Sequence, residues 1–282
     1  MIYFSKQQKV KVHQIFMRFT IAEPTNRRSV QQYTRTIENA FGKLTIKSTQ
    51  KLIARDLKVF IALATYIYAH MDSVEVVANK KNLYSVTIDL YDFVKDFMHR
   101  RPSANIYNAV IDSLTALSQT RIEGEYIMKD ADNIEKVQVK TSILPYLEIR
   151  SKREKAKRGS EKITIDLFIF EWILRMFSNP LPKSLIVDNY ILQQTNSSVA
   201  TLLALFLMSQ SRATSYSKSF LVEQLQLHAL KENDNIDREL KKAFSELQEI
   251  GYIQSWHIEK RADDTYYVFS RTTTALPKPK KK

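Results

Sequence analysis

The chain has no cysteine and little glycine, and each shortage excludes classes of protein. Without cysteine, its 282 residues form no disulfide, no cysteine-ligated zinc site and no catalytic thiol. Four glycines leave no place for a glycine-rich phosphate-binding loop. The five histidines are scattered and have no metal-site spacing. We therefore expect no cofactor, no metal and no catalytic residue, and predict that the protein is not an enzyme.

Long hydrophobic runs are also missing. The longest, VATLLALFLM at 199–208, contains a threonine and is too short to span a bilayer. The N-terminal segment MIYFSKQQKVKVHQ alternates polar and apolar residues and does not have the pattern of a signal peptide. We expect a cytoplasmic protein with no membrane partner.

Positive charge is what the chain has in excess. There are 43 lysines and arginines against 30 acidic residues, a formal net charge of +13. This balance favours a polyanionic partner, nucleic acid first and an anionic membrane surface second. The hydrophobic fraction of 44% supports packed cores, and the length suffices for two domains.

Two segments 130 residues apart carry the same amphipathic helical pattern. Their inward positions are Ile106, Val110, Leu114 and Leu117, then Ile236, Leu240, Phe244 and Leu247. Each segment runs into an apolar strand, a polar hairpin tip and a second strand. Helix, strand, wing and strand form the C-terminal half of a winged helix, so the sequence predicts two such units.

We predict an α+β fold of two tandem winged-helix domains. Its parts are a basic N-terminal extension (1–50), domain one (51–150), a basic linker (151–162), domain two (163–271) and a disordered basic tail (272–282). Within them we expect a helix over 29–41, a first wing over 120–149 and a helix over 166–177. The stretch RSKREKAKRGSEK at 150–162 also fits a long β-hairpin tip, and charge alone does not separate that alternative from a linker.

The outward face of the second repeated helix is the best candidate DNA reader. Arginine suits the acceptors of guanine, and asparagine suits those of adenine. The expected contacts in and around this helix are Lys231, Asn233, Asn235, Arg238, Lys241, Lys242 and Ser245, with Lys260 and Arg261 at the wing tip. In domain one they are Arg100, Arg101, Ser103, Asn105 and Asn108. Because Asp112 stands where domain two has Lys242, we expect domain two to be the main reader.

Three segments carry a family resemblance: DLKVFIALATYIYAHM (56–71), NIYNAVIDSLTALSQTRIEG (105–124) and RELKKAFSELQEIGYI (238–253). With them the chain resembles plasmid replication initiators of the tandem winged-helix, iteron-binding type. The resemblance implies that two winged helices clamp successive major grooves of a directly repeated origin site in double-stranded DNA. It also implies origin opening, recruitment of a host replication initiator and helicase, and homodimers formed through domain one.

Two other functions remain open at this point. A winged-helix transcriptional regulator or autorepressor would bind an operator through the same elements. Tandem winged helices also occur in protein-interaction subunits of chromosome-condensing complexes, but those would not need a net charge of +13 or a basic wing tip. An anionic membrane surface is disfavoured, since no long basic amphipathic helix with exposed aromatic residues stands out.

Overall fold

The computed structural model describes most of the chain. It covers residues 9–13, 21–25, 27–29, 31–39, 42–76, 83–129, 134–153, 161–170, 184–210, 213–230, 233–262 and 264–272. The predicted tail, apart from residue 272, lies outside the described residues, as does Lys231. Within the described part, no helix combines the length and the apolar composition needed to cross a bilayer.

The first winged helix is built around α2 (Ala54–Ala69), which is buried along most of its length. The 3₁₀ turn η1 (Met71–Ser73), β4 (Glu75–Val76) and β5 (Leu83–Asp89) follow it. Next come α3 (Leu90–Asp92), the π-helical turn η2 (Phe93–Phe97) and α4 (Ala104–Ser118). The Asp89 carboxylate accepts the Tyr91 backbone N–H at 2.9 Å, and the Ser103 hydroxyl accepts that of Ile106 at 3.4 Å. Asp89 and Ser103 are therefore the N-caps of α3 and α4.

The wing of this unit is not the hairpin that we expected. Strands β8 (Tyr146–Arg153) and β9 (Glu161–Phe170) pair with each other, and β9 also pairs with β5 in a sheet of order β4-β5-β9-β8. The predicted linker is therefore wrong for 151–153 and 161–162, where the pairing of Arg153 with Glu161 confirms the hairpin alternative, and residues 154–160 lie outside the described residues. The predicted helix at 166–177 is wrong for 166–170, and its remainder lies outside the described residues.

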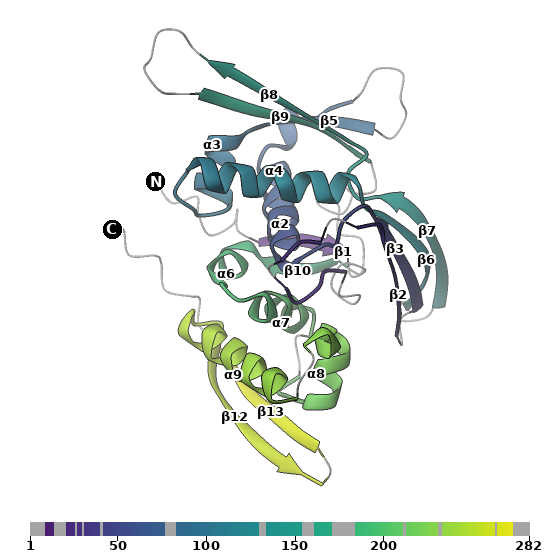
Figure 1. The fold of residues 1–282 in the computed structure, drawn as a ribbon, viewed down its shortest axis with the longest axis vertical. Helices are drawn as coiled ribbons and strands as arrows, with labels where there is room; N and C mark the ends of the chain where they lie inside the picture. The colour runs from purple at the N-terminus through teal and green to yellow at the C-terminus, as the bar shows by residue number, and fades with distance from the viewer. Residues whose placement is uncertain are drawn as a thin grey trace.

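The N-terminal extension is part of the fold. Strands β2 (Tyr33–Asn39) and β3 (Gly42–Ser48) form a hairpin, so the predicted helix at 29–41 is wrong for 33–39. The hairpin joins β6 (Arg121–Lys129) and β7 (Ile134–Ser142) in a sheet of order β2-β3-β6-β7. The segment predicted as the first wing, 120–149, therefore belongs mostly to this second sheet, which lies beside the winged helix (Figure 1).

One glycine makes the pairing of β3 with β6 possible. Gly124 lies opposite Leu44 with a φ of +155°. A Cβ atom at this position would lie 2.2 Å from the Lys43 carbonyl oxygen and 2.9 Å from Leu44 Cα. Both distances are too short for any side chain, so the close approach of these strands requires glycine.

The second winged helix follows β10 (Ser184–Asp188), which pairs with β1 (Lys9–His13), and α6 (Asn189–Gln194). Its elements are α7 (Ser198–Ser209), β11 (Ser215–Ser217), α8 (Lys218–Leu225), the 3₁₀ turn η3 (Leu227–Ala229), α9 (Asn233–Glu249), β12 (Ile253–Arg261) and β13 (Asp264–Arg271). The sheet order β11-β13-β12 places the wing hairpin next to the short first strand. Domain one has the same arrangement, with β5 in the place of β11, so the predicted fold of two winged helices is confirmed, although the first wing lies in a later segment than expected.

Candidate nucleic-acid interface

Helix α9 presents the two faces that the sequence predicts. Ile236, Leu240, Phe244 and Leu247 are buried, and Phe244 stacks on Tyr267 of β13 with ring centroids 5.1 Å apart. Arg238, Lys241 and Lys242 are exposed on the helix, whereas Asn235 and Ser245 are half-buried. The helix therefore presents three cations to solvent. Asn233 is its first residue.

The Arg238 side chain is positioned by its own helix. Its Nη2 donates a 2.9 Å hydrogen bond to Asn235 Oδ1, and its side chain is 72% exposed. A guanidinium has five N–H donors, so this bond leaves donors for a base edge. Asn235 thus orients Arg238 as well as being a candidate reader itself.

Asp237 on α9, which was not among the predicted site residues, is paired with a lysine. Lys218 Nζ, at the start of α8, lies 2.9 Å from Asp237 Oδ1. The Tyr267 hydroxyl donates to the same oxygen at 3.4 Å. Burial raises the pKa of Tyr267, and the Asp237 charge raises it further. This tyrosine therefore remains a donor at neutral pH, and the two partners offset a carboxylate that would repel phosphates.

The two cations of the second wing differ in their surroundings. Arg261 is bonded to Glu259, with Nη2 and Oε2 2.5 Å apart, and its guanidinium lies 4.8 Å from the Tyr266 ring centre. Hydrogen bonds from His257 and Arg261 lower the pKa of Glu259. Lys260 is exposed and has no ion-pair partner among the described residues. Of the two, Lys260 is the stronger candidate for a phosphate contact.

Helix α4 presents fewer candidate readers than α9. Asn105 and Asn108 are exposed in its first turns, and Arg101 is exposed just before it. Asn105 is the second residue of the helix, and Ser103 is its N-cap, so the Ser103 hydroxyl already accepts a backbone hydrogen bond. Arg100 is exposed, but its Nη2 donates to the Gln193 carbonyl oxygen at 3.1 Å.

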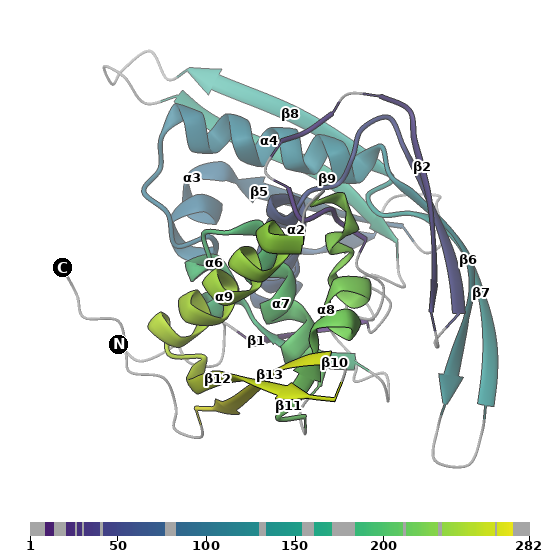
Figure 2. The same cartoon turned by 60° about the horizontal axis from the view of Figure 1, so that its bottom comes forward.

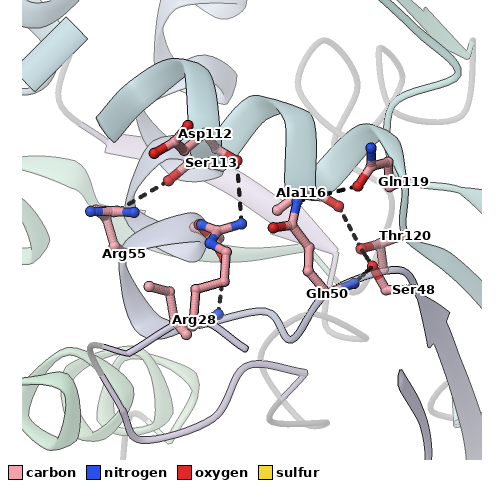
Figure 3. A network of polar contacts seen from close by, with 11 residues as sticks. Arg28, Ser48, Gln50, Arg55, Asp112, Ser113, Ala116, Gln119 and Thr120 are labelled. Carbon is pink, nitrogen blue, oxygen red and sulfur yellow. Dashed lines mark hydrogen bonds and ion pairs between the residues drawn. The ribbon is translucent and has the colours of Figure 1, made fainter. Parts of the chain in front are cut away.

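The C-terminal half of α4 is held by residues from the N-terminal segment and from α2 (Figure 3). Arg28 donates to the Asp112 carbonyl oxygen at 3.2 Å and forms an ion pair with Asp56, which is fully buried. Burial raises the pKa of Asp56, and the Arg28 charge opposes this. Arg55 Nε donates to the Ser113 hydroxyl at 3.3 Å. These contacts restrict the free reading surface of α4 to its first two turns.

A polar junction fixes the second domain to the first. Lys58 of α2 is buried, and its Nζ donates to the carbonyl oxygens of Thr195 at 2.7 Å and of Gln193 at 3.3 Å. Gln193 Nε2 donates back to the Lys58 carbonyl oxygen at 3.0 Å. Asn189 Nδ2 donates to the Phe97 carbonyl oxygen at 2.7 Å. The two winged helices are thus joined by side chains as well as by the chain.

This arrangement of two winged helices with an extra N-terminal sheet has relatives among solved structures. The fold is similar to that of RctB domains 2 and 3. A selenomethionine derivative of these domains matches with a TM-score of 0.62 at 13% identity, over 93% of this chain and 99% of that one. A structure of RctB 155–483 matches with a TM-score of 0.58 at 13% identity, over 92% and 96%. No protein-family model and no curated protein sequence matches the chain.

The first wing of the structure includes residues 151–153 and 161–162 of the segment predicted as a linker. The strands β8 and β9 lead into and out of the stretch REKAKRGSE. Arg150, near the base of this wing, is bonded to Glu148 at 2.9 Å and lies 3.2 Å from Asp166. Lys152 and Lys162 face each other in the strand register. The period-two alternation of Ile163, Ile165, Leu167 and Ile169 was the signal that identifies this strand.

The candidate reading elements lie on one side of the molecule. In Figure 1, α4 and α9 both cross the near side, with α6 and α7 between them, and the two wings extend at opposite ends. Turning the molecule brings α9 forward and leaves α4 above it (Figure 2). Within the described residues there is no cluster of histidine and acidic side chains that could hold a metal ion.

Proposed function

We propose that the protein is a replication initiator that binds double-stranded origin DNA with both winged helices at once. Helix α9 is the main sequence reader in this proposal, and the first two turns of α4 are the second. The observation that carries the proposal is the placement of α4 and α9 on one side of the molecule, with Lys58 hydrogen-bonded across the junction between the two winged helices. The net charge of +13 and the exposed Arg238, Lys241 and Lys242 supply the attraction to DNA.

The finer part of the proposal follows the sequence resemblance. The site is a set of direct repeats at a plasmid origin, and the bound protein helps to open the neighbouring DNA and recruits host replication proteins in the cytoplasm. Its work is binding rather than catalysis. The similarity of the fold to that of RctB domains 2 and 3 supports the part of the proposal that assigns two winged helices to one DNA-binding protein.

The test begins with selection of bound duplexes from a random-sequence pool, followed by footprinting on the selected sequence. The proposal expects one protein chain to protect two successive major grooves of one duplex, about 10 bp apart. Protection of a single groove would contradict the two-reader model. Recovery of no preferred sequence would contradict specific binding altogether.

The sequence of the DNA beside the reading frame distinguishes a replication initiator from a transcriptional repressor. Direct repeats of about 20 bp, each covering two helical turns, support the initiator. A lone palindrome bound by two chains would instead assign the protein as an operator-binding regulator. Replication of a small circle that carries the repeats, with and without the protein, completes the test.

A further inference from the structure

A cavity of about 270 Å³ lies at the junction of the two winged helices. Its walls are α2, the first half of α4, and the connection from α6 to α7. Liquid water occupies about 30 Å³ per molecule, so the space is large enough for several waters or a small polar group. The ionisable side chains that line it are Arg55, Lys58 and Arg100, all cationic. No acidic side chain lines it in the described part of the chain.

Each of these cations keeps N–H groups that no described residue accepts. The Lys58 ammonium has three, and donates to the carbonyl oxygens of Gln193 and Thr195. Arg55 donates only through Nε to Ser113, and Arg100 through Nη2 to Gln193, among the described residues. A guanidinium has five N–H donors, which leaves both arginines able to bind an anion with two parallel hydrogen bonds.

Among the described residues, no carboxylate forms an ion pair with a cation of this cavity. Lys58 is buried, and burial lowers its pKa to about 8, with the nearby Arg100 charge acting in the same direction. One acid acts on Lys58, Glu246 of α9, which accepts the backbone N–H groups of Asn196 and Ser197. The Glu246 charge raises the pKa of Lys58, but the pKa stays lowered because burial is the larger effect. A buried cation without a counter-charge costs free energy, and an anion in the cavity would relieve that cost.

We propose that this cavity binds a phosphate group, and that the DNA backbone supplies it. The inference rests on the proposed function for its source of phosphate. Ile106 and Val110 of α4 line one wall, and Asn196 at the start of α7, which α9 touches through Glu246, lines another. The cavity therefore lies between the two candidate reading helices. A duplex that presents successive major grooves to α4 and α9 carries its backbone across this position.

The first arm of the test measures coupling between a protein side chain and one DNA phosphate. Single neutral methylphosphonates are scanned across the selected duplex, and binding is measured with the full-length protein. We expect one or two positions between the two protected grooves to weaken wild-type binding about tenfold, the size of a lost charge-assisted hydrogen bond. The variants Arg100→Gln and Arg55→Gln should bind the unmodified duplex more weakly and lose nothing further at those positions.

A matched control removes one charge elsewhere. Lys43→Gln, in β3, changes an exposed cation whose ion pair with Glu38 is also exposed. This variant should retain the full wild-type sensitivity to the neutral phosphates. Circular dichroism and thermal melting verify that each variant is folded. If Arg100→Gln destabilises the protein because its hydrogen bond to Gln193 is lost, Arg55→Gln still tests the proposal.

The second arm asks whether free phosphate binds. Thermal melting is compared in inorganic phosphate and in chloride at equal ionic strength. A rise in Tm that is lost in Arg100→Gln, without coupling on DNA, would assign the cavity to a free phosphate compound. The proposal would be overturned if each methylphosphonate reduced the DNA affinity of the wild type and of all variants equally, and if inorganic phosphate did not raise the Tm.

The two proposals can fail separately. If the random pool yields no preferred sequence, the origin-binding function fails, and the coupling is then measured on a fixed duplex of about 30 bp, long enough for three helical turns. If selection and footprinting succeed but neither arm detects a phosphate, only the cavity assignment fails.

Discussion

The ammonium group of Lys58 lies 2.7 Å from the carbonyl oxygen of Thr195 and joins the first winged helix to the segment that opens the second. This lysine has two opposing effects on stability. Its hydrogen bonds hold two domains together, whereas its burial disfavours the charged form of the side chain. This contact is one of those that set the position of α9 relative to α4.

The stability of the protein should rise with pH in the window set by Lys58. Its folded pKa of about 8 lies below the value of about 10.4 for an unfolded lysine, so the unfolded chain binds more protons between these values. Between pH 7.5 and 9.5 the wild type should gain about 2 kcal/mol of unfolding free energy relative to Lys58→Met. Urea unfolding at several pH values measures this difference. Lys43→Met is the exposed control, and parallel profiles for wild type and Lys58→Met would contradict the prediction.

Replacing Arg238 with alanine should reduce sequence discrimination more than overall DNA affinity. The exposed guanidinium, oriented by Asn235, is placed to reach a guanine edge, and such a contact contributes about 1–3 kcal/mol of discrimination. Competition between the selected duplex and a scrambled one measures the change. Arg121→Ala, which removes an exposed cation from β6, should leave the ratio unchanged. An equal loss on both duplexes would show that Arg238 contacts only the backbone.

The two cations of the second wing should differ in their effect on salt dependence. Lys260→Ala should weaken binding to all sequences and reduce the slope of log affinity against log salt by about one. Arg261→Ala should have the smaller effect, because its guanidinium is already paired with Glu259 and stacked on Tyr266. Titrations of DNA with each variant at several salt concentrations measure these slopes. An unchanged slope for Lys260→Ala would exclude a phosphate contact by this residue.

Adding one methyl group at Gly124 should destabilise the N-terminal sheet. The new Cβ of Gly124→Ala would meet the Lys43 carbonyl oxygen at 2.2 Å, and the backbone cannot relieve this without separating β3 from β6. We expect a loss of about 2 kcal/mol or more, the range of a steric and backbone defect in a core. Chemical unfolding measures it, with Lys140→Ala in exposed β7 as the control. A loss below that of the control would contradict the required close approach.

The helices that carry the reading faces could be predicted because their pattern is local. The spacing of Leu240, Phe244 and Leu247 identifies an inward face within three turns, and the outward cations follow from it. The capping of three helix starts by Asp89, Ser103 and Ser197 is equally local, since each side chain accepts a backbone hydrogen bond from a residue two or three positions later. Self-association through domain one and recruitment of host proteins stay predictions.

The elements that were missed depend on contacts distant in sequence. Strand β2 has the β-branched Thr34, Thr36 and Ile37, yet only its pairing with β3, which in turn pairs with β6, decides its conformation. The Arg28–Asp56 ion pair joins the N-terminal segment to α2, and no local pattern reveals it. The first wing was misplaced since two consecutive hairpins follow α4, and sequence order alone does not say which of them pairs with β5.

The pairing of β1 with β10 also has a consequence for synthesis on the ribosome. Lys9 pairs with Asp188, so the first described strand leaves the ribosome long before its partner exists. At 5–20 residues per second, translation of the intervening chain lasts on the order of ten to forty seconds. Throughout that interval an unpaired strand edge is available to chaperones or to other nascent chains. The β1–β10 sheet can therefore form only after β9, the last strand of the first winged helix, has been made.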